Sequence, residues 1–142
     1  MASLWEGHEL GDVVTEATFE VSRDSLVRYA GASGDFNPIH YRDDIAQSVG
    51  LEGVLAHGML TMGLAVSSIT EWLGNRGFVA DYQVRFTKPV YVPVTGSATI
   101  SVSASLAQVD EPAEGLATLA LSVSTEDGTK VLGKAFVVVS PR

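Results

Sequence analysis

The segment 58–73 constrains the fold of this chain more than any other part of the sequence. It reads Gly-Met-Leu-Thr-Met-Gly-Leu-Ala-Val-Ser-Ser-Ile-Thr-Glu-Trp-Leu, and Gly74 follows it as a C-terminal stop signal. In the helix that this sequence predicts, apolar residues lie almost all round the first three turns, which is typical of a buried helix. Gly58 and Gly63 are poor helix formers, so we expect close backbone packing at both. The rest of the chain must therefore cover this helix.

The sequence after this helix has the alternation of amphipathic strands. Apolar residues recur at every second position in two runs, with small or polar residues between them, so one face is buried and the other is wet. The apolar positions are Ala98, Ile100, Val102, Ala104 and Leu106, and then Leu119, Leu121 and Val123. Strands over 82–90 and 131–139 complete the set, and Asp127-Gly128 marks a hairpin turn before the last strand. One long helix followed by about four antiparallel strands predicts an α+β fold in which the sheet wraps around the helix.

The segment before the helix is predicted to be mixed. The expected elements are an irregular strand over 10–21, a short helix from the N-cap Ser22 to about Ala30, a loop over 31–40 and a second short helix over about 42–49, ended by Gly50. No repeat or low-complexity tract interrupts the sequence, so residues 1–142 are read as one domain.

Composition and charge narrow the class of protein. Hydrophobic residues make up 46% of the 142 residues and charged residues only 18%, which argues against disorder and suggests that another chain covers some apolar surface. The formal charge of −8 disfavours nucleic acid or an anionic membrane as a partner. An acidic or phosphorylated partner would need a local basic patch. The candidates for such a patch are Arg23, Arg28, Arg42, Arg76, Arg85 and Lys88.

The sequence also bears on cellular location. There is no cysteine, so neither disulfides nor thiolate chemistry contributes. The N-terminal residues lack the basic region and apolar stretch of a signal peptide, and the apolar run over 58–73 is too short and too polar for a membrane span. We therefore expect a soluble, cytoplasmic protein.

Residues 34–40 contain the residue types that chemistry needs. Gly34 and Pro38 interrupt regular structure, so Asp35, Asn37 and His40 are predicted to lie on an ordered turn. A carboxyl group and an imidazole five residues apart suit proton transfer in both directions. Pro38 fixes the backbone between this pair, and Asn37 is expected to support the loop rather than react.

The start of the long helix supplies a second requirement. His57 stands just before Gly58, where the first backbone N–H groups lack partners within the helix and carry partial positive charge. Glycine allows a carbonyl oxygen to approach these donors closely. A proton-transfer pair together with an oxyanion site at Gly58 suits chemistry next to a carbonyl group.

A metal site is the alternative reading of the same residues. Asp35, His40 and His57 are types that bind zinc. The chain has no HxxxH or HxxE pair to support such a site, however. We therefore expect no metal, and we read His57 as a helix-start residue that shapes the pocket.

These residues also carry a resemblance to a known family. The positions Tyr29, Ser33 to Asp35, Asn37 to His40 and Ala46 match the signature of the (R)-specific enoyl hydratases, which are MaoC-like hot-dog proteins; residues 56–63 and 84–87 are similar as well. The chain resembles most closely the catalytic subunit of actinobacterial (3R)-hydroxyacyl-ACP dehydratases. The resemblance implies a hot-dog fold, Asp35 and His40 as the proton-transfer pair, and the Gly58 N–H as the donor to the acyl carbonyl. Some homodimeric relatives have a serine in the helix where this chain has Val66, so we assign no such serine.

The expected function is that of a hydro-lyase that interconverts (3R)-3-hydroxyacyl and trans-2-enoyl thioesters of CoA or acyl carrier protein, without a cofactor. An acyl thioesterase and a non-catalytic partner subunit of a dehydratase remain as alternatives. The apolar composition and the unpaired edges of a single small sheet further predict a dimer with the pocket where two units meet. We expect a homodimer for the isolated protein, and the resemblance adds a heterodimer with a related hot-dog subunit.

Overall fold

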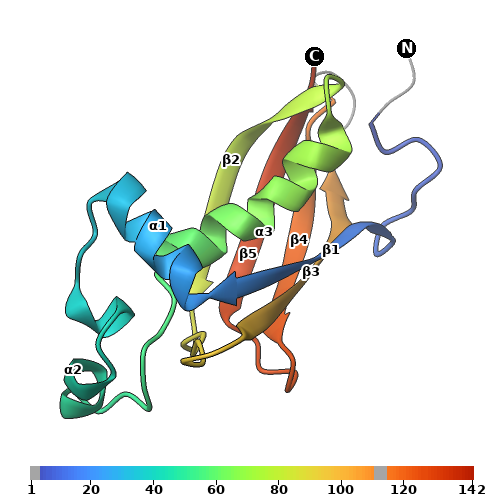
Figure 1. Ribbon diagram of the computed structural model, residues 1–142. Coiled ribbons are helices and arrows are strands. Elements are labelled where there is room, and N and C mark those ends of the chain that lie inside the picture. Colours follow the sequence, from blue (N-terminus) through green and yellow to red (C-terminus); the bar gives the residue numbers. More distant parts are fainter. Residues whose placement is uncertain (1–3, 111–114) are drawn as a thin grey trace.

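The protein folds as one antiparallel sheet with a long helix across it. The computed structural model describes residues 4–110 and 115–142. Its elements are β1 (Val13–Ser22), α1 (Arg23–Ser33), the 3-10 turn η1 (Pro38–His40), α2 (Asp43–Ser48), α3 (Gly58–Leu73), β2 (Gly77–Phe86), β3 (Ser97–Val109), β4 (Ala117–Thr125) and β5 (Leu132–Pro141). The strand order is β1-β3-β4-β5-β2, and every pair of neighbours is antiparallel. Figure 1 shows α3 lying across one face of the sheet, with α1 and α2 to one side near its N-terminal end. The predicted α+β architecture is confirmed.

The core lies between α3 and the face of the sheet that the alternation predicted. The inward positions of β3, β4 and β5 are buried, whereas the serines between them stay exposed or half-buried. The fully buried side chains of this layer include Ile100, Leu106, Leu119, Val123 and Val137, and α3 adds Ile69 and Leu73. Burial of a side chain of this size stabilises the fold by about 1.5–3 kcal/mol. The period-two pattern therefore identified the buried face correctly.

Helix α3 has the predicted bounds but not the predicted burial. Its buried positions lie on the face toward the sheet, and they include the polar Thr61 and Ser68. Away from the sheet, Met59 is 59% exposed, and a Cβ added at Gly63 would meet no atom within 4 Å. The expectation of close packing at Gly63 is therefore wrong for the single chain, because one sheet covers only one side of a helix. No helix in the described ranges is long and apolar enough to cross a membrane.

The bounds of several elements differ from the sequence prediction; β1, for example, begins at Val13 rather than at residue 10. Ser22 caps α1 in a reciprocal pair with Ser25, as expected, but α1 continues past Ala30 to Ser33. It ends at Gly34, whose left-handed φ of 77° favours glycine, whereas Gly31 carries only the modest cost of glycine inside a helix. Strand β2 starts at Gly77 and ends at Phe86 rather than running over 82–90. The prediction failed at the C-terminal end because the chain turns away there from β5 to another partner: the Val90 carbonyl accepts from the Ala56 N–H, and Tyr91 forms a bridge with Leu55.

Candidate active site

The loop after α1 is folded by a series of short side-chain hydrogen bonds. The Ser33 hydroxyl oxygen accepts from the Asp35 N–H (3.1 Å), Asp35 Oδ1 accepts from the Asn37 N–H (3.1 Å), and Asn37 Oδ1 accepts from the Ile39 N–H (3.2 Å). These are the turns that Ser, Asp and Asn favour over regular structure. The loop thus presents the exposed Asp35 at its tip and leads directly into η1, which carries His40.

His40 is held in one tautomer. Its side chain is buried, and Nδ1 lies 2.7 Å from the carbonyl oxygen of Leu55. Because a carbonyl oxygen only accepts hydrogen bonds, Nδ1 carries the hydrogen and Nε2 of the neutral ring has a free lone pair. His40 therefore offers a proton acceptor with a fixed direction.

His57 is more deeply buried and is held in the opposite tautomer. Its Nε2 lies 3.1 Å from the carbonyl oxygen of Asp35, so Nε2 carries the hydrogen. Its Nδ1 is buried, and no group in the described ranges bonds it. Burial lowers the pKa of His57 below its ordinary value of 6.5, and this effect outweighs the hydrogen bond to the Asp35 carbonyl, which acts in the opposite direction. The ring is therefore neutral near neutral pH.

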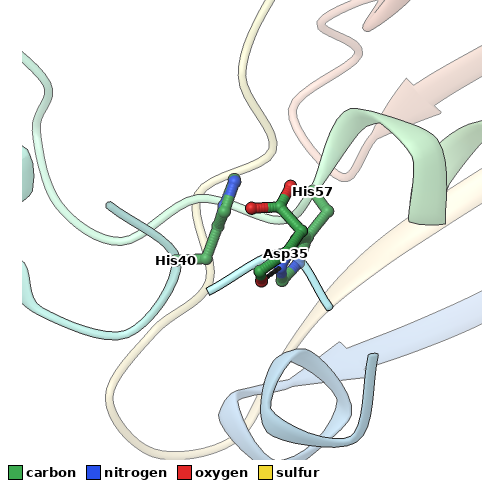
Figure 2. Close-up of side chains that lie close together, drawn as sticks. All are labelled: Asp35, His40 and His57. Carbon is green, nitrogen blue, oxygen red and sulfur yellow. Dashed lines mark hydrogen bonds between the residues drawn. The ribbon is translucent and has the colours of Figure 1, made fainter. Parts of the chain in front are cut away.

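The two histidines stack on one another beside Asp35. Their ring centroids are 3.8 Å apart with an interplanar angle of 21°, and the Tyr29 ring meets His57 edge-on at 4.7 Å. Figure 2 shows the three side chains gathered together, with the Asp35 carboxylate turned toward the His40 side. Residues from the loop after α1, from η1 and from the start of α3 are thus brought into one cluster.

The arrangement of Asp35, His40 and His57 differs from that of a tetrahedral zinc site. Asp35, His40 and His57 each offer a ligand atom, and these atoms lie within 4.8 Å of one another. A tetrahedral zinc ion would draw its ligand atoms to about 3.3 Å from each other. The rings of His40 and His57 are nearly parallel, so their in-plane lone pairs do not converge on one point.

Unpaired backbone donors lie at the start of α3. His57 is the N-cap residue, but its side chain makes no capping hydrogen bond. The N–H groups of Leu60 and Thr61 donate back to the His57 carbonyl, and in the described chain those of Gly58 and Met59 have no acceptor. A Cβ at Gly58 would lie 3.0 Å from Cε1 of Phe86, so the ring packs directly over the glycine. This helix end can receive a partial negative charge.

The cluster and the helix start open onto one cavity of about 470 Å³. Asp35, His40, His57 and Gly58 lie on its wall. Most of the remaining wall is apolar, and its members include Leu55, Met59, Phe86, Val90, Val131 and Leu132. The cavity therefore joins a carboxyl group and an imidazole, unpaired N–H donors and room for an apolar group.

The profile of the MaoC like domain matches residues 8–125 of this sequence. The chain belongs to the MaoC-like family. It is 31% identical over 114 residues to the (R)-specific enoyl-CoA hydratase of Aeromonas caviae, and the aligned region covers 79% of this chain and 81% of that protein. It is 35% identical over 79 residues to the 3-hydroxyacyl-thioester dehydratase X of Mycobacterium tuberculosis, and the aligned region covers 56% of this chain but only 27% of that protein. A solved MaoC-like dehydratase superposes with a TM-score of 0.86 at 33% identity, over 96% of this chain and 41% of that one. These matches confirm the predicted family and the hot-dog fold. The chain spans less than half of the length of two of these three proteins.

Four of the six candidates for a basic patch in this MaoC-like chain are engaged by neighbouring groups. Arg23, Arg28 and Arg42 pair with neighbouring carboxylates, because an aspartate lies within reach of each. Arg76 donates to the Trp72 carbonyl and lies over its ring. Of the six candidates, Arg85 and Lys88 are in no ion pair within the described ranges, and Lys88 lines the cavity.

Sequence reasoning missed the support beneath this MaoC-like site. Arg23 binds Asp43 through two nitrogens (2.9 and 3.1 Å) and donates from Nε to the Val92 carbonyl (2.9 Å). Asp43 Oδ1 also accepts from the Val54 N–H (3.0 Å). The hydrogen bond from Arg23, and then that from Val54, lower the pKa of the Asp43 carboxyl. This clamp ties α1 and α2 to the segments that flank the cavity. The sequence indicates Arg23 only as a candidate for a basic patch, because no local pattern signals its partners at positions 43 and 92.

Proposed function

We propose that this chain is a hydro-lyase that interconverts (3R)-3-hydroxyacyl thioesters and trans-2-enoyl thioesters. The observation that carries the proposal is the shared cavity of about 470 Å³, where the Asp35 carboxylate and the lone pair of His40 Nε2 lie near the uncapped start of α3. The names of the relatives, (R)-specific enoyl-CoA hydratase and 3-hydroxyacyl-thioester dehydratase, support the same reaction type.

In dehydration, we assign removal of the α-proton to His40. Its Nε2 is the free acceptor, because Nδ1–H is bonded to Leu55. The C–O bond then breaks as Asp35, in the form of the pair in which its carboxyl group carries the shared proton, donates that proton to the departing 3-hydroxyl, which leaves as water. His40 and Asp35 offer ligand atoms within 4.8 Å of one another, so the proton on His40 can return to Asp35 through a single water molecule and reset the pair. Hydration runs the same steps in reverse.

Loss of the α-proton places negative charge on the thioester oxygen. The N–H groups of Gly58 and Met59 are free donors at the positive end of α3, and in our proposal they receive this oxygen. One such donor is worth about 2.7–4 kcal/mol of transition-state stabilisation in other enzymes. Because the thioester itself acidifies the α-carbon, the proposed chemistry needs no cofactor.

The cavity offers less to a thioesterase. That reaction needs a nucleophile or a carboxylate beside the thioester carbonyl. Asp35 is the one carboxylate on the described wall of the cavity, and in our proposal it acts at the 3-hydroxyl instead. The α3 residues on the cavity wall are Gly58, Met59 and Thr61, and no base in the described chain bonds the Thr61 hydroxyl. The hydroxyls of Ser67 and Ser68 donate to carbonyls of their own helix.

A non-catalytic subunit would not need an acid and a base, and this chain retains both in the form of Asp35 and His40.

The proposal includes a dimer and a cytoplasmic location. Strand β2 is an edge of the sheet, with β5 on one side only, and the side of α3 away from the sheet exposes Met59. A second hot-dog unit, either another copy or a related subunit, would hydrogen-bond to the free edge of β2 and cover the exposed side of α3.

The deciding experiment is a hydration assay with crotonyl-CoA and with longer enoyl thioesters of acyl carrier protein. It is run with the protein alone and with a candidate partner, and the configuration of the product is determined. Formation of the (3R)-alcohol supports the proposal. Hydrolysis of the thioester, in place of hydration of the double bond, would show that the protein is a thioesterase and not a hydro-lyase.

A further inference from the structure

We propose that His57 is a positioning residue that fixes the placement of His40 relative to Asp35 and leaves the start of α3 free to bind an oxyanion. This inference rests on the proposed function and extends it, because His57 itself need not touch the substrate. Two contacts of the His57 ring, and one capping bond that its side chain does not make, each serve a different part of the site.

The first contact holds the Asp35 loop. The hydrogen bonds of Ser33, Asp35 and Asn37 fold the loop upon itself and do not attach it to the body of the protein. In the described chain, the one hydrogen bond from the Asp35 backbone to a distant element is the bond from His57 Nε2–H to its carbonyl oxygen. Since Asp35 and its neighbours in the loop are exposed, packing adds little to hold them. His57 therefore decides where the carboxyl group stands.

The second contact holds the ring of His40. The hydrogen bond to Leu55 fixes the direction of one ring nitrogen, but a single bond leaves the ring free to turn about it. Stacking on His57 at 3.8 Å fixes the plane of the ring as well. Tyr29 in turn meets His57 edge-on, so that ring is itself held from another side. Both reacting groups thus take their positions from the same imidazole.

The third feature is a capping bond that His57 does not make. An N-cap side chain normally accepts from one of the first helical N–H groups. The His57 ring is turned to Asp35 and His40 instead, and its Nδ1 acceptor is buried without a partner in the described ranges. Unsatisfied buried acceptors are rare in folded proteins and are commonly found where function requires them. Here the result is that Gly58 and Met59 keep free N–H groups. Burial also lowers the pKa of His57, so the neutral ring does not compete with His40 for the proton.

Two substitutions separate the contacts. His57→Phe keeps a flat ring against His40 but removes the donor to Asp35. His57→Gln loses the ring but keeps an N–H at a similar reach. We expect kcat of His57→Phe to fall by about 10²-fold with KM changed much less, since a misplacement of about 1 Å costs that much in rate. We expect His57→Gln to recover part of this loss. Ser68→Ala is the matched control, because Ser68 is buried on the same helix and outside the cavity.

The readouts distinguish positioning from a structural role. If kcat of His57→Phe falls only in proportion to Tm, as calibrated by Ser68→Ala, or if His57→Gln is no better than His57→Phe, the proposal is overturned. Amide hydrogen exchange of residues 34–37 gives a test that needs no activity: exchange should accelerate in His57→Phe and be slowed again in His57→Gln. If the wild type hydrates no enoyl thioester, the proposed function fails while this exchange test still decides the positioning. If the variants do not fold, NMR of the wild type decides, because a His57 ring without hydrogen on Nε2 would refute the proposed bond.

Discussion

The ring of Phe86 lies over Gly58 so closely that a Cβ on the glycine would stand 3.0 Å from Cε1 and 3.2 Å from Cδ1 and Cζ. Phe86 is 55% exposed and comes from the end of β2, so the ring is a movable side chain rather than part of the packed core. The ring and the glycine face the same cavity. A change at Gly58 is therefore expected to alter the cavity before it alters the fold.

The first prediction follows from this contact. Gly58→Ala should displace the Phe86 ring and lower kcat/KM severalfold, with little change in Tm. Gly31→Ala, inside α1, is the control: it meets no neighbour within 4 Å and should stabilise the fold by up to about 1 kcal/mol, because alanine is the better helix former. Steady-state kinetics and thermal unfolding of both variants test this. Equal activity of the two alanine variants would contradict the role given to Gly58.

The second prediction concerns the proton-transfer pair. Asp35→Asn and His40→Asn should each reduce hydration kcat by about 10²–10⁴-fold, because each removes one acid/base group. Both substitutions keep local bonds: the amide oxygen introduced at position 35 can still accept from the Asn37 N–H, and the amide introduced at position 40 can still donate to the Leu55 carbonyl. His40→Ala, which loses that bond as well, should be at least as impaired. Near-normal turnover in either folded asparagine variant would remove the pair from the mechanism.

The third prediction is that strong chelators leave turnover unchanged. The near-parallel rings of His40 and His57 do not aim two lone pairs at a common ion. Activity is measured before and after treatment with EDTA and a stronger chelator, and after zinc is added back. Loss of activity that zinc restores would make the cluster of Asp35, His40 and His57 a metal site after all.

The fourth prediction concerns the pH dependence of stability. Burial lowers the pKa of His57 in the folded state below 6.5, so the unfolded chain binds the proton more readily. The stability that the neutral ring contributes is therefore present above the unfolded pKa and is lost as pH falls from about 6.5 through the folded pKa. The free energy of unfolding of the wild type should decline more between pH ~7.5 and ~5 than that of His57→Phe. Parallel declines in urea denaturation would show that His57 does not titrate as the structure indicates.

The fifth prediction is a dimer at assay concentration. The exposed side of α3 and the open edge of β2 are the surfaces that a second hot-dog unit would cover. Sedimentation velocity of the isolated chain, repeated with a related subunit, measures the assembly. A stable and fully active monomer would exclude the dimer, and with it a pocket shared between two units.

The sequence predicted those parts of the molecule whose signals are local. The bounds of α3 follow from its apolar run and Gly74, and the buried face of β3 follows from its alternation. Asp35 and His40 were singled out because turn residues surround them within a few positions. The hydrogen bond from His57 to the Asp35 carbonyl could not be predicted, because the two residues are 22 positions apart and meet only once α3 is docked. For the same reason the clamp between Arg23 and Asp43 was missed: the arginine reaches the Val92 carbonyl 69 positions further along.

The polar lining and the apolar lining of the cavity come from separate parts of the chain. The proposed acid, base and oxyanion donors lie between Asp35 and Met59, whereas much of the apolar lining lies at 86–90 and 131–132. Substitutions in the apolar lining can therefore change which acyl groups fit without disturbing the acid and the base. Such a division would allow the range of accepted acyl groups to change by point mutations in the lining, while the proposed acid and base stay in place.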